Sequence, residues 1–131
     1  MLDIEVIGAD AVGPAGPSVA EIIQLCTLAF ASAGIEEGHA AVQFVGTQRI
    51  RELNREFRDV DAATDVLSFG VDEHRSPAGP RELGDVVICL DRTRDVREAV
   101  VHGALHLTGM DHAGDEGEML ALQAELMRWT A

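Results

Sequence analysis

The sequence predicts an α+β fold with α/β-like layers, in which a small mixed sheet of about four strands is packed by about four helices. Segments with the apolar patterns of strands alternate along the chain with segments of helical periodicity. The chain has 131 residues, 47% of them apolar, which is enough to bury a core without disulfide support. No repeat or long linker interrupts it, so we expect residues 1–131 to form a single domain.

Four segments are expected to be strands. The first alternates apolar and acidic residues, which is typical of a half-exposed edge strand. The last is almost uniformly apolar, which is typical of a strand buried on both faces. Glycine, proline and charged residues predict loops at 8–17 and 71–83. The expected strands are residues 2–6, 41–45, 64–69 and 84–90.

The first expected helix runs from Ser18 to about Ser32 and ends before Gly34. Ser18 and Glu21 have the spacing of a capping box at its start. The apolar residues of this helix recur at helical spacing and are expected to face the core. They are Val19, Ile22, Ile23, Cys26 and Phe30.

The second expected helix is capped by Thr47 and runs to about Phe57. Its apolar side carries Ile50, Leu53 and Phe57. Another side carries a stripe of three arginines, for which the pattern alone predicts a solvated face screened by Glu52 and Glu56. The three are Arg51, Arg55 and Arg58.

The third and fourth helices are predicted from caps and apolar stripes. The third begins at Asp91 or Thr93 and is fixed by burial of its other faces. The fourth begins at Asp115, with Glu118 three residues on. Its packing stripe is expected to comprise Met119, Leu122, Leu126 and Trp129.

Three of the five histidines lie in residues 102–112, at offsets of four and then six. On a helix, His102 and His106 share one face and can bind one metal ion. Gly109 can end that helix in a left-handed conformation, and His112 can then supply a third imidazole. Three neutral ligands with an open fourth position are typical of catalytic zinc, which lowers the pKa of its bound water to about 7.

Two details of this segment limit the interpretation. The offsets match the long zinc-peptidase motif, but Gly103 stands where that motif carries its general-base glutamate, so peptidase chemistry is disfavoured. Asp111 either orients an imidazole from outside the ligand set or is a turn residue.

The remaining histidines and the cysteines are assigned structural roles. His39 and His74 are expected to be solvent-exposed. Cys26 and Cys89 are expected to be reduced core residues, because the two cysteines lack ligand or disulfide spacing.

No segment has the length of an apolar membrane span, and the N-terminus has no signal core, so we expect a cytoplasmic protein with no membrane contact. A net charge of −13 argues against broad, nonspecific binding of nucleic acid.

Three blocks resemble the YbeY endoribonuclease family of rRNA maturation factors. The first is Leu53-Asn54 with Phe57-Arg58 and then residues 64–69, the second is residues 84–88, and the third is residues 102–112. The resemblance implies a zinc-dependent, single-strand-specific endoribonuclease that matures small-subunit rRNA at its 3′ end and takes part in ribosome quality control. It also implies contacts with the ribosomal small subunit, including one of its proteins, and with an Era-type GTPase.

Carried over by position, the resemblance implies that His102, His106 and His112 bind one Zn²⁺ and that Arg58 is functionally important. Arg58 is then expected to contact phosphate or stabilise developing charge, because its guanidinium suits phosphate geometry. Asp65 and Asp111 are general-base candidates by residue type only. The nucleophile is either water or a ribose 2′-hydroxyl.

A second hypothesis is a non-catalytic ribosome assembly factor in which zinc holds residues 102–112 together. The short segment from Cys89 to His102 and the acidic composition motivate it. It predicts that chelation unfolds the protein.

Overall fold

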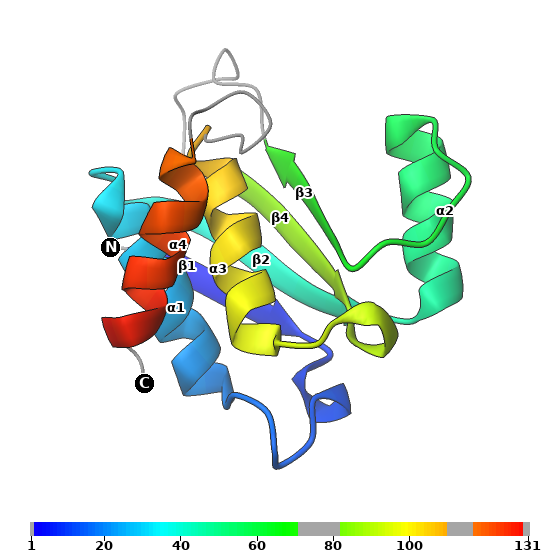
Figure 1. Cartoon of the computed structure of the whole chain (residues 1–131), viewed down its shortest axis with the longest axis horizontal. Coiled ribbons are helices and arrows are strands. Elements are labelled where there is room, and N and C mark those ends of the chain that lie inside the picture. The colour runs from blue at the N-terminus through cyan, green and yellow to red at the C-terminus, as the bar shows by residue number, and fades with distance from the viewer. Residues whose placement is uncertain (1, 71–81, 110–116, 130–131) are drawn as a thin grey trace.

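The computed structural model describes residues 2–70, 82–109 and 117–129. Within these ranges the chain forms one sheet of four strands and four α-helices, with two short 3-10 turns (Figure 1). This confirms the predicted α+β fold with a small sheet. In chain order the elements are β1 (Leu2–Ile7), the turn Ala9–Ala11, α1 (Val19–Ser32), β2 (Gly38–Val45), α2 (Thr47–Arg58), β3 (Val66–Gly70), β4 (Glu82–Cys89), the turn Leu90–Arg92, α3 (Val96–Leu107) and α4 (Glu118–Trp129).

The sheet has the strand order β1-β2-β4-β3. β1 pairs with β2 and β2 with β4 in parallel, whereas β3 pairs with β4 antiparallel, so the predicted mixed sheet is confirmed. β1 lies at one edge, as its alternating sequence predicted, and β3 lies at the other. β4 is interior, and it buries Val86 and Ile88 against one layer and Val87 and Cys89 against the other.

The strand boundaries differ from the predicted ones by a few residues. β2 begins at Gly38 because the ladder with β1 already pairs Leu2 with Gly38. β3 begins at Val66, two residues later than predicted. Asp65 lies just outside the strand, and its Oδ1 accepts hydrogen bonds from the backbone N–H of Val66 at 2.9 Å and from Thr64 Oγ1 at 3.2 Å.

The helices form two unequal layers. α1, α3 and α4 cover one face of the sheet, whereas α2 is the one described helix on the other face (Figure 1). The larger core lies under the three helices, and its most buried large side chains include Phe30, Ile22, Leu105 and Met119. The smaller core joins α2 to the sheet through Ile50, Leu53, Leu67, Val87 and Cys89.

The capping box of α1 is confirmed, because the Ser18 side chain accepts from the Glu21 N–H and Glu21 reaches back to the N–H of Ser18. Two residues predicted to face the core do not. Val19 and Ile23 are exposed, since the packed side of α1 runs through Ile22, Cys26 and Phe30, and their positions lie beside it.

Two predictions for α2 are wrong. Thr47 is not its cap: Gly46 holds that position without a side-chain bond, and Thr47 Oγ1 instead donates to Asp91 Oδ2 at 3.3 Å. Phe57 does not join Ile50 and Leu53 in the core and is 58% exposed. It lies in the last turn of α2, where its ring meets Phe69 edge to face at a centroid distance of 5.3 Å.

α3 begins at Val96, later than either predicted start. Asp91 belongs to the preceding 3-10 turn, and Thr93 is extended, with its hydroxyl donating to the Cys89 carbonyl at 2.7 Å. Asp95 is the N-cap instead, and its carboxylate accepts from the Glu98 N–H at 3.2 Å. The helix is fixed by burial, as predicted, and its fully buried residues include Val100, Val101, Ala104 and Leu105.

In α4, Met119 and Leu126 are buried and Leu122 packs against the same core, as predicted. The predicted cap Asp115, the Trp129 side chain and His74 lie outside what the structure describes.

Cys26 and Cys89 are buried free thiols, and burial raises the pKa of Cys26 to about 12. Over the described ranges, no helix has both the length and the apolar character needed to cross a membrane.

His39 is half-buried rather than solvent-exposed, with 26% of its side chain accessible. It lies on β2 between Glu82 on β4 and Glu5 on β1, and its Nδ1 is 3.1 Å from a carboxylate oxygen of Glu82. The hydrogen bond with Glu82 raises the pKa of His39 above its ordinary value. This histidine therefore belongs to an ion-pair cluster in the sheet, with Glu5 and Glu82, and not to the pair formed by His102 and His106.

Candidate active site

The imidazoles of His102 and His106 meet on one face of α3, as their spacing predicted. Their Nε2 atoms are 3.1 Å apart, and the ring centroids are separated by 4.7 Å. Two nitrogens bound to one tetrahedral zinc ion at about 2.0 to 2.1 Å would lie about 3.3 Å apart. The two imidazoles therefore have the donor type and the separation that a shared zinc ion requires.

Gln123 of α4 hydrogen-bonds to His102 through the ring nitrogen that is not directed towards His106. Its Oε1 lies 2.8 Å from Nδ1 of His102, and the Gln123 side chain is buried. An amide oxygen can only accept, so Nδ1 of His102 is the donor. In the neutral ring this leaves Nε2 as the lone-pair nitrogen directed towards His106.

Gln123 was missed by the sequence interpretation because it lies 21 residues from His102. A signal was present, however. Gln123 stands four residues after Met119 and three before Leu126, within the buried stripe of α4. A polar residue in such a stripe needs a hydrogen-bond partner.

His112 and Asp111, predicted as the third ligand and as either an orienting or a turn residue, lie outside the described residues. Across residues 2–70, 82–109 and 117–129, no group of three or more potential metal ligands comes together. Gly109 has a φ of +99° just after α3, in the left-handed region. The chain therefore turns at the predicted place.

Gly103 is required by the close approach of α3 to the sheet. A Cβ at this position would lie 2.3 Å from Cγ1 of Val86, well inside van der Waals contact. The Gly103 carbonyl accepts a hydrogen bond from Ser68 Oγ of β3 at 3.0 Å. A glutamate at position 103, as in zinc peptidases, would collide with β4.

Arg58 faces the histidines from the opposite side of the site. It ends α2, and its Nη2 donates to the backbone carbonyl of Ser68. Its guanidinium also lies 5.2 Å from the centroid of the Phe69 ring. Because a guanidinium has five N–H donors, these contacts leave others that can reach a bound anion.

The neighbouring arginines behave differently. Arg51 is fixed by Asp61 through two hydrogen bonds, Nε to Oδ1 at 2.8 Å and Nη2 to Oδ2 at 3.2 Å, rather than by the predicted Glu52 and Glu56. The pair is exposed, and the Arg51 guanidinium lowers the pKa of Asp61. Arg55 is exposed, as predicted.

Asn54 gives the Leu53-Asn54 block a structural role. It is buried, and its Nδ2 donates to the carbonyl of Ala62 at 2.9 Å. Its own carbonyl accepts from the N–H of Val60 at 3.2 Å. Asn54 thus holds the turn after α2 that leads into Thr64 and Asp65.

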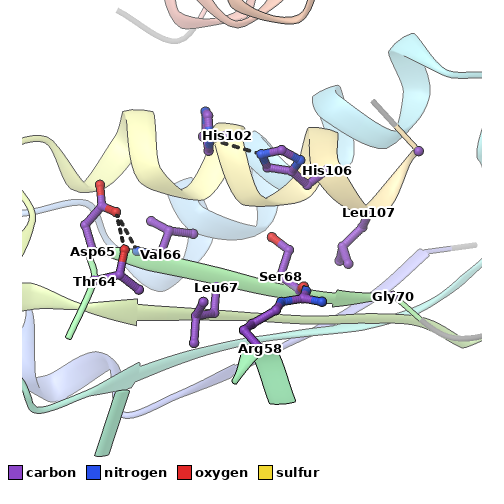
Figure 2. A pocket seen from close by; sticks show the side chains of 11 residues that line it. Arg58, Thr64, Asp65, Val66, Leu67, Ser68, Gly70, His102, His106 and Leu107 are labelled. Atoms are coloured by element: carbon purple, nitrogen blue, oxygen red, sulfur yellow. Dashed lines mark hydrogen bonds between the residues drawn. The ribbon is translucent and has the colours of Figure 1, made fainter. Parts of the chain in front are cut away.

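His102, His106 and Arg58 line one hollow of about 660 Å³, a volume within the usual range for ligand sites. Figure 2 shows the two histidines on α3 across from Arg58 and Ser68, with Thr64 and Asp65 on one flank. The structure thus brings His102, His106 and Arg58 into one site. The hollow is lined by Arg58, Thr64, Asp65, Val66, Leu67, Ser68, Gly70, His102, His106, Leu107 and Gly109.

The protein is thus of the α+β class, with a mixed four-stranded sheet. Its candidate active site is a cleft in which two imidazoles on α3 face an arginine. Residues 18–130 match the family model described as endoribonuclease YbeY. The chain belongs to the YbeY endoribonuclease family. The family that the three sequence blocks suggested is therefore confirmed.

Relatives named endoribonuclease YbeY cover most of the chain. The protein from Anaeromyxobacter sp. (strain Fw109-5) is 42% identical over 130 residues, covering 88% of this chain and 67% of the relative. The protein from Rubrobacter xylanophilus is 43% identical over 110 residues, covering 79% and 78%. The solution structure of a Thermotoga maritima protein matches the fold with a TM-score of 0.54 and 21% identity, covering 97% of this chain and 88% of that one.

Proposed function

We propose that this protein is a zinc-dependent, single-strand-specific endoribonuclease that matures small-subunit rRNA at its 3′ end and takes part in ribosome quality control. Membership of a family whose relatives are named endoribonucleases supports the activity class. The observation that carries the proposal is the 3.1 Å approach of the His102 and His106 Nε2 atoms in a hollow that also holds Arg58. We further propose that it works in the cytoplasm.

The zinc ion would be held by His102 and His106 together with His112. Bound there, zinc would polarise a phosphoryl oxygen of the RNA or activate the attacking oxygen. Gln123 keeps the Nδ1 proton of His102 in place, so that Nε2 is available as a ligand.

Arg58 would bind the scissile phosphate from the opposite wall. The Ser68 carbonyl and the Phe69 ring fix its guanidinium, so little side-chain freedom is lost when RNA binds. Charge developing on the phosphate oxygens in the transition state would then be stabilised by donors already in position. Asp65, whose Oδ1 is held by two donors, lies on the flank of the same hollow and is our candidate general base.

The net charge of −13 shapes the proposal for partners. Such a protein repels RNA at long range, and Arg58 acts only at contact distance. We therefore propose that the ribosomal small subunit presents its single-stranded rRNA to the site. One of the small-subunit proteins and an Era-type GTPase are the proposed docking partners.

Zinc removal tests the proposal directly. We expect chelation to abolish cleavage of single-stranded RNA, and stoichiometric zinc to restore it, while duplex RNA of the same sequence stays intact. The fold should persist without metal, because α3 is held by fully buried residues such as Val100, Val101 and Leu105. Cleavage assays and melting curves measure both effects.

Two results of that experiment would count against the proposal. Cleavage that survives complete chelation would remove zinc from the mechanism. Cooperative unfolding on chelation would favour the assembly-factor hypothesis, in which zinc is structural.

Replacing Gln123 by leucine should weaken zinc binding by about 10- to 100-fold, because an outer partner that orients a ligating histidine is lost. A competition titration with a chromogenic chelator measures this without RNA. Gln24→Leu, at an exposed position on α1, is the matched control. Equal zinc affinity in both variants would show that Gln123 does not orient His102.

A further inference from the structure

A second hollow, of about 580 Å³, lies on the other face of the sheet, between α2 and the strands. Its walls combine apolar, aromatic, polar and charged side chains. They are Leu53, Val87, Phe57, Phe69, Gln43, Asp85, Arg49 and Arg58. A pocket of this size that combines aromatic and aliphatic walls with polar and charged groups can hold a small flat ligand that carries hydrogen-bonding groups.

The two hollows meet at the outer edge of the sheet. Arg58 and Gly70 line both of them. They meet there because β3 is the edge strand, so that a ligand can pass around it. Figure 2 shows the Arg58 side chain reaching β3 at Ser68, whose backbone carbonyl it bonds. A polymer whose phosphate contacts Arg58 can therefore place its next unit in the second hollow.

Phe57 is the most unusual residue of this hollow. It is 58% exposed, the largest exposed fraction among the large apolar residues that the structure describes. Its ring is supported edge to face by Phe69, which in turn lies against the Arg58 guanidinium. Aromatic side chains placed beside arginine are the surfaces on which bases of single-stranded nucleic acids stack.

Asp85 supplies the hollow with a group that can recognise the edge of a base. It is the direct β4 neighbour of Phe69, so both side chains point to the same face of the sheet. Burial, together with the nearby Glu82 carboxylate, raises the pKa of Asp85. A carboxyl group here can bond to the N–H groups of a base edge, while Arg49 and Arg58 in the same lining favour the neighbouring phosphates.

We propose that this hollow is a nucleobase subsite, in which a base adjacent to the phosphate at Arg58 stacks on Phe57. The proposal rests on the proposed function, since it takes single-stranded RNA as the substrate. It assigns to α2 two tasks: binding the phosphate through Arg58 and binding the neighbouring base through Phe57.

The test combines protein variants with RNAs that lack one base. Binding of a fluorescein-labelled, short single-stranded RNA to zinc-free protein is measured by anisotropy, so that cleavage does not interfere. Phe57→Leu should weaken binding by about 5- to 150-fold, the range typical of base stacking on an aromatic ring. Phe57→Trp should bind as wild type. Ile23→Ala, which removes an exposed apolar residue from α1, should have no effect.

A series of RNAs with one abasic nucleotide, moved along the strand, separates stacking from a structural role. At one position, removing the base should weaken RNA binding by the wild type by the same factor as Phe57→Leu does. Removing that same base should not weaken RNA binding by Phe57→Leu any further. Equal losses in both proteins at every position, or wild-type binding by Phe57→Leu, would overturn the subsite.

The same binding measurements, together with cleavage assays on zinc-loaded protein, distinguish the two proposals. If the wild type binds and cleaves single-stranded RNA but shows no coupling between Phe57 and any base, the subsite alone is wrong. If the wild type neither binds nor cleaves single-stranded RNA, the proposed function fails and the subsite fails with it.

Discussion

Replacing His106 by alanine is expected to reduce cleavage of single-stranded RNA by about 10³-fold or more while leaving the protein folded. The substitution removes one of the two Nε2 atoms that lie 3.1 Å apart. Loss of the ion would remove several kcal/mol of charge stabilisation, and about 1.4 kcal/mol corresponds to a tenfold change in rate. The steady-state cleavage rate and the zinc affinity measured by titration should fall together.

His39→Ala is the matched control for this experiment. His39 is also half-buried and bonded to a neighbour, but it lies in the ion-pair cluster with Glu5 and Glu82. Its loss should leave cleavage and zinc binding unchanged. Equal cleavage by His106→Ala and wild type would point to a contaminating nuclease and would exclude the proposed site.

Replacing Arg58 by alanine is expected to reduce kcat by about 10²- to 10³-fold, the usual cost of removing a donor that stabilises transition-state charge. Arg58→Lys should recover only part of this loss. An ammonium keeps the charge but cannot reproduce the guanidinium fork that bonds the Ser68 carbonyl and a phosphate together. Single-turnover cleavage at saturating protein isolates the effect on the chemical step.

Arg55→Ala serves as the control because Arg55 is an exposed arginine one turn earlier on the same helix. It changes the net charge by the same amount but lies outside the lining of both hollows that contain Arg58. Similar losses for the two variants would mean that general electrostatics, rather than the position of Arg58, accounts for the effect.

Local patterns predicted the parts of this protein that depend on short spacings. Offsets of four placed His102 and His106 on one face of α3, because a helix returns to the same face after about one turn. The capping box Ser18–Glu21 predicted the start of α1 for the same reason. The uniformly apolar run of β4 predicted burial on both faces.

Features that depend on distant segments escaped prediction. Phe57 continues the spacing of Ile50 and Leu53, yet it is exposed where they are buried. Helical periodicity predicts on which side of α2 a residue lies. It does not predict how far along α2 the contact with the sheet extends. The start of α3 was misplaced because Thr93 bonds to the Cys89 carbonyl, a contact with the end of β4.

The sequence by itself determined the mixed α+β fold, the family and the pairing of His102 with His106, because each follows from neighbours along one element or from a linear motif. Only the tertiary structure decided what surrounds that pair. It placed Gln123 beside His102, Arg58 across the hollow and Phe57 against Phe69 on the α2 side of the sheet. These positions arise when separate helices pack against one another and on the two faces of one sheet, and no local spacing encodes that packing.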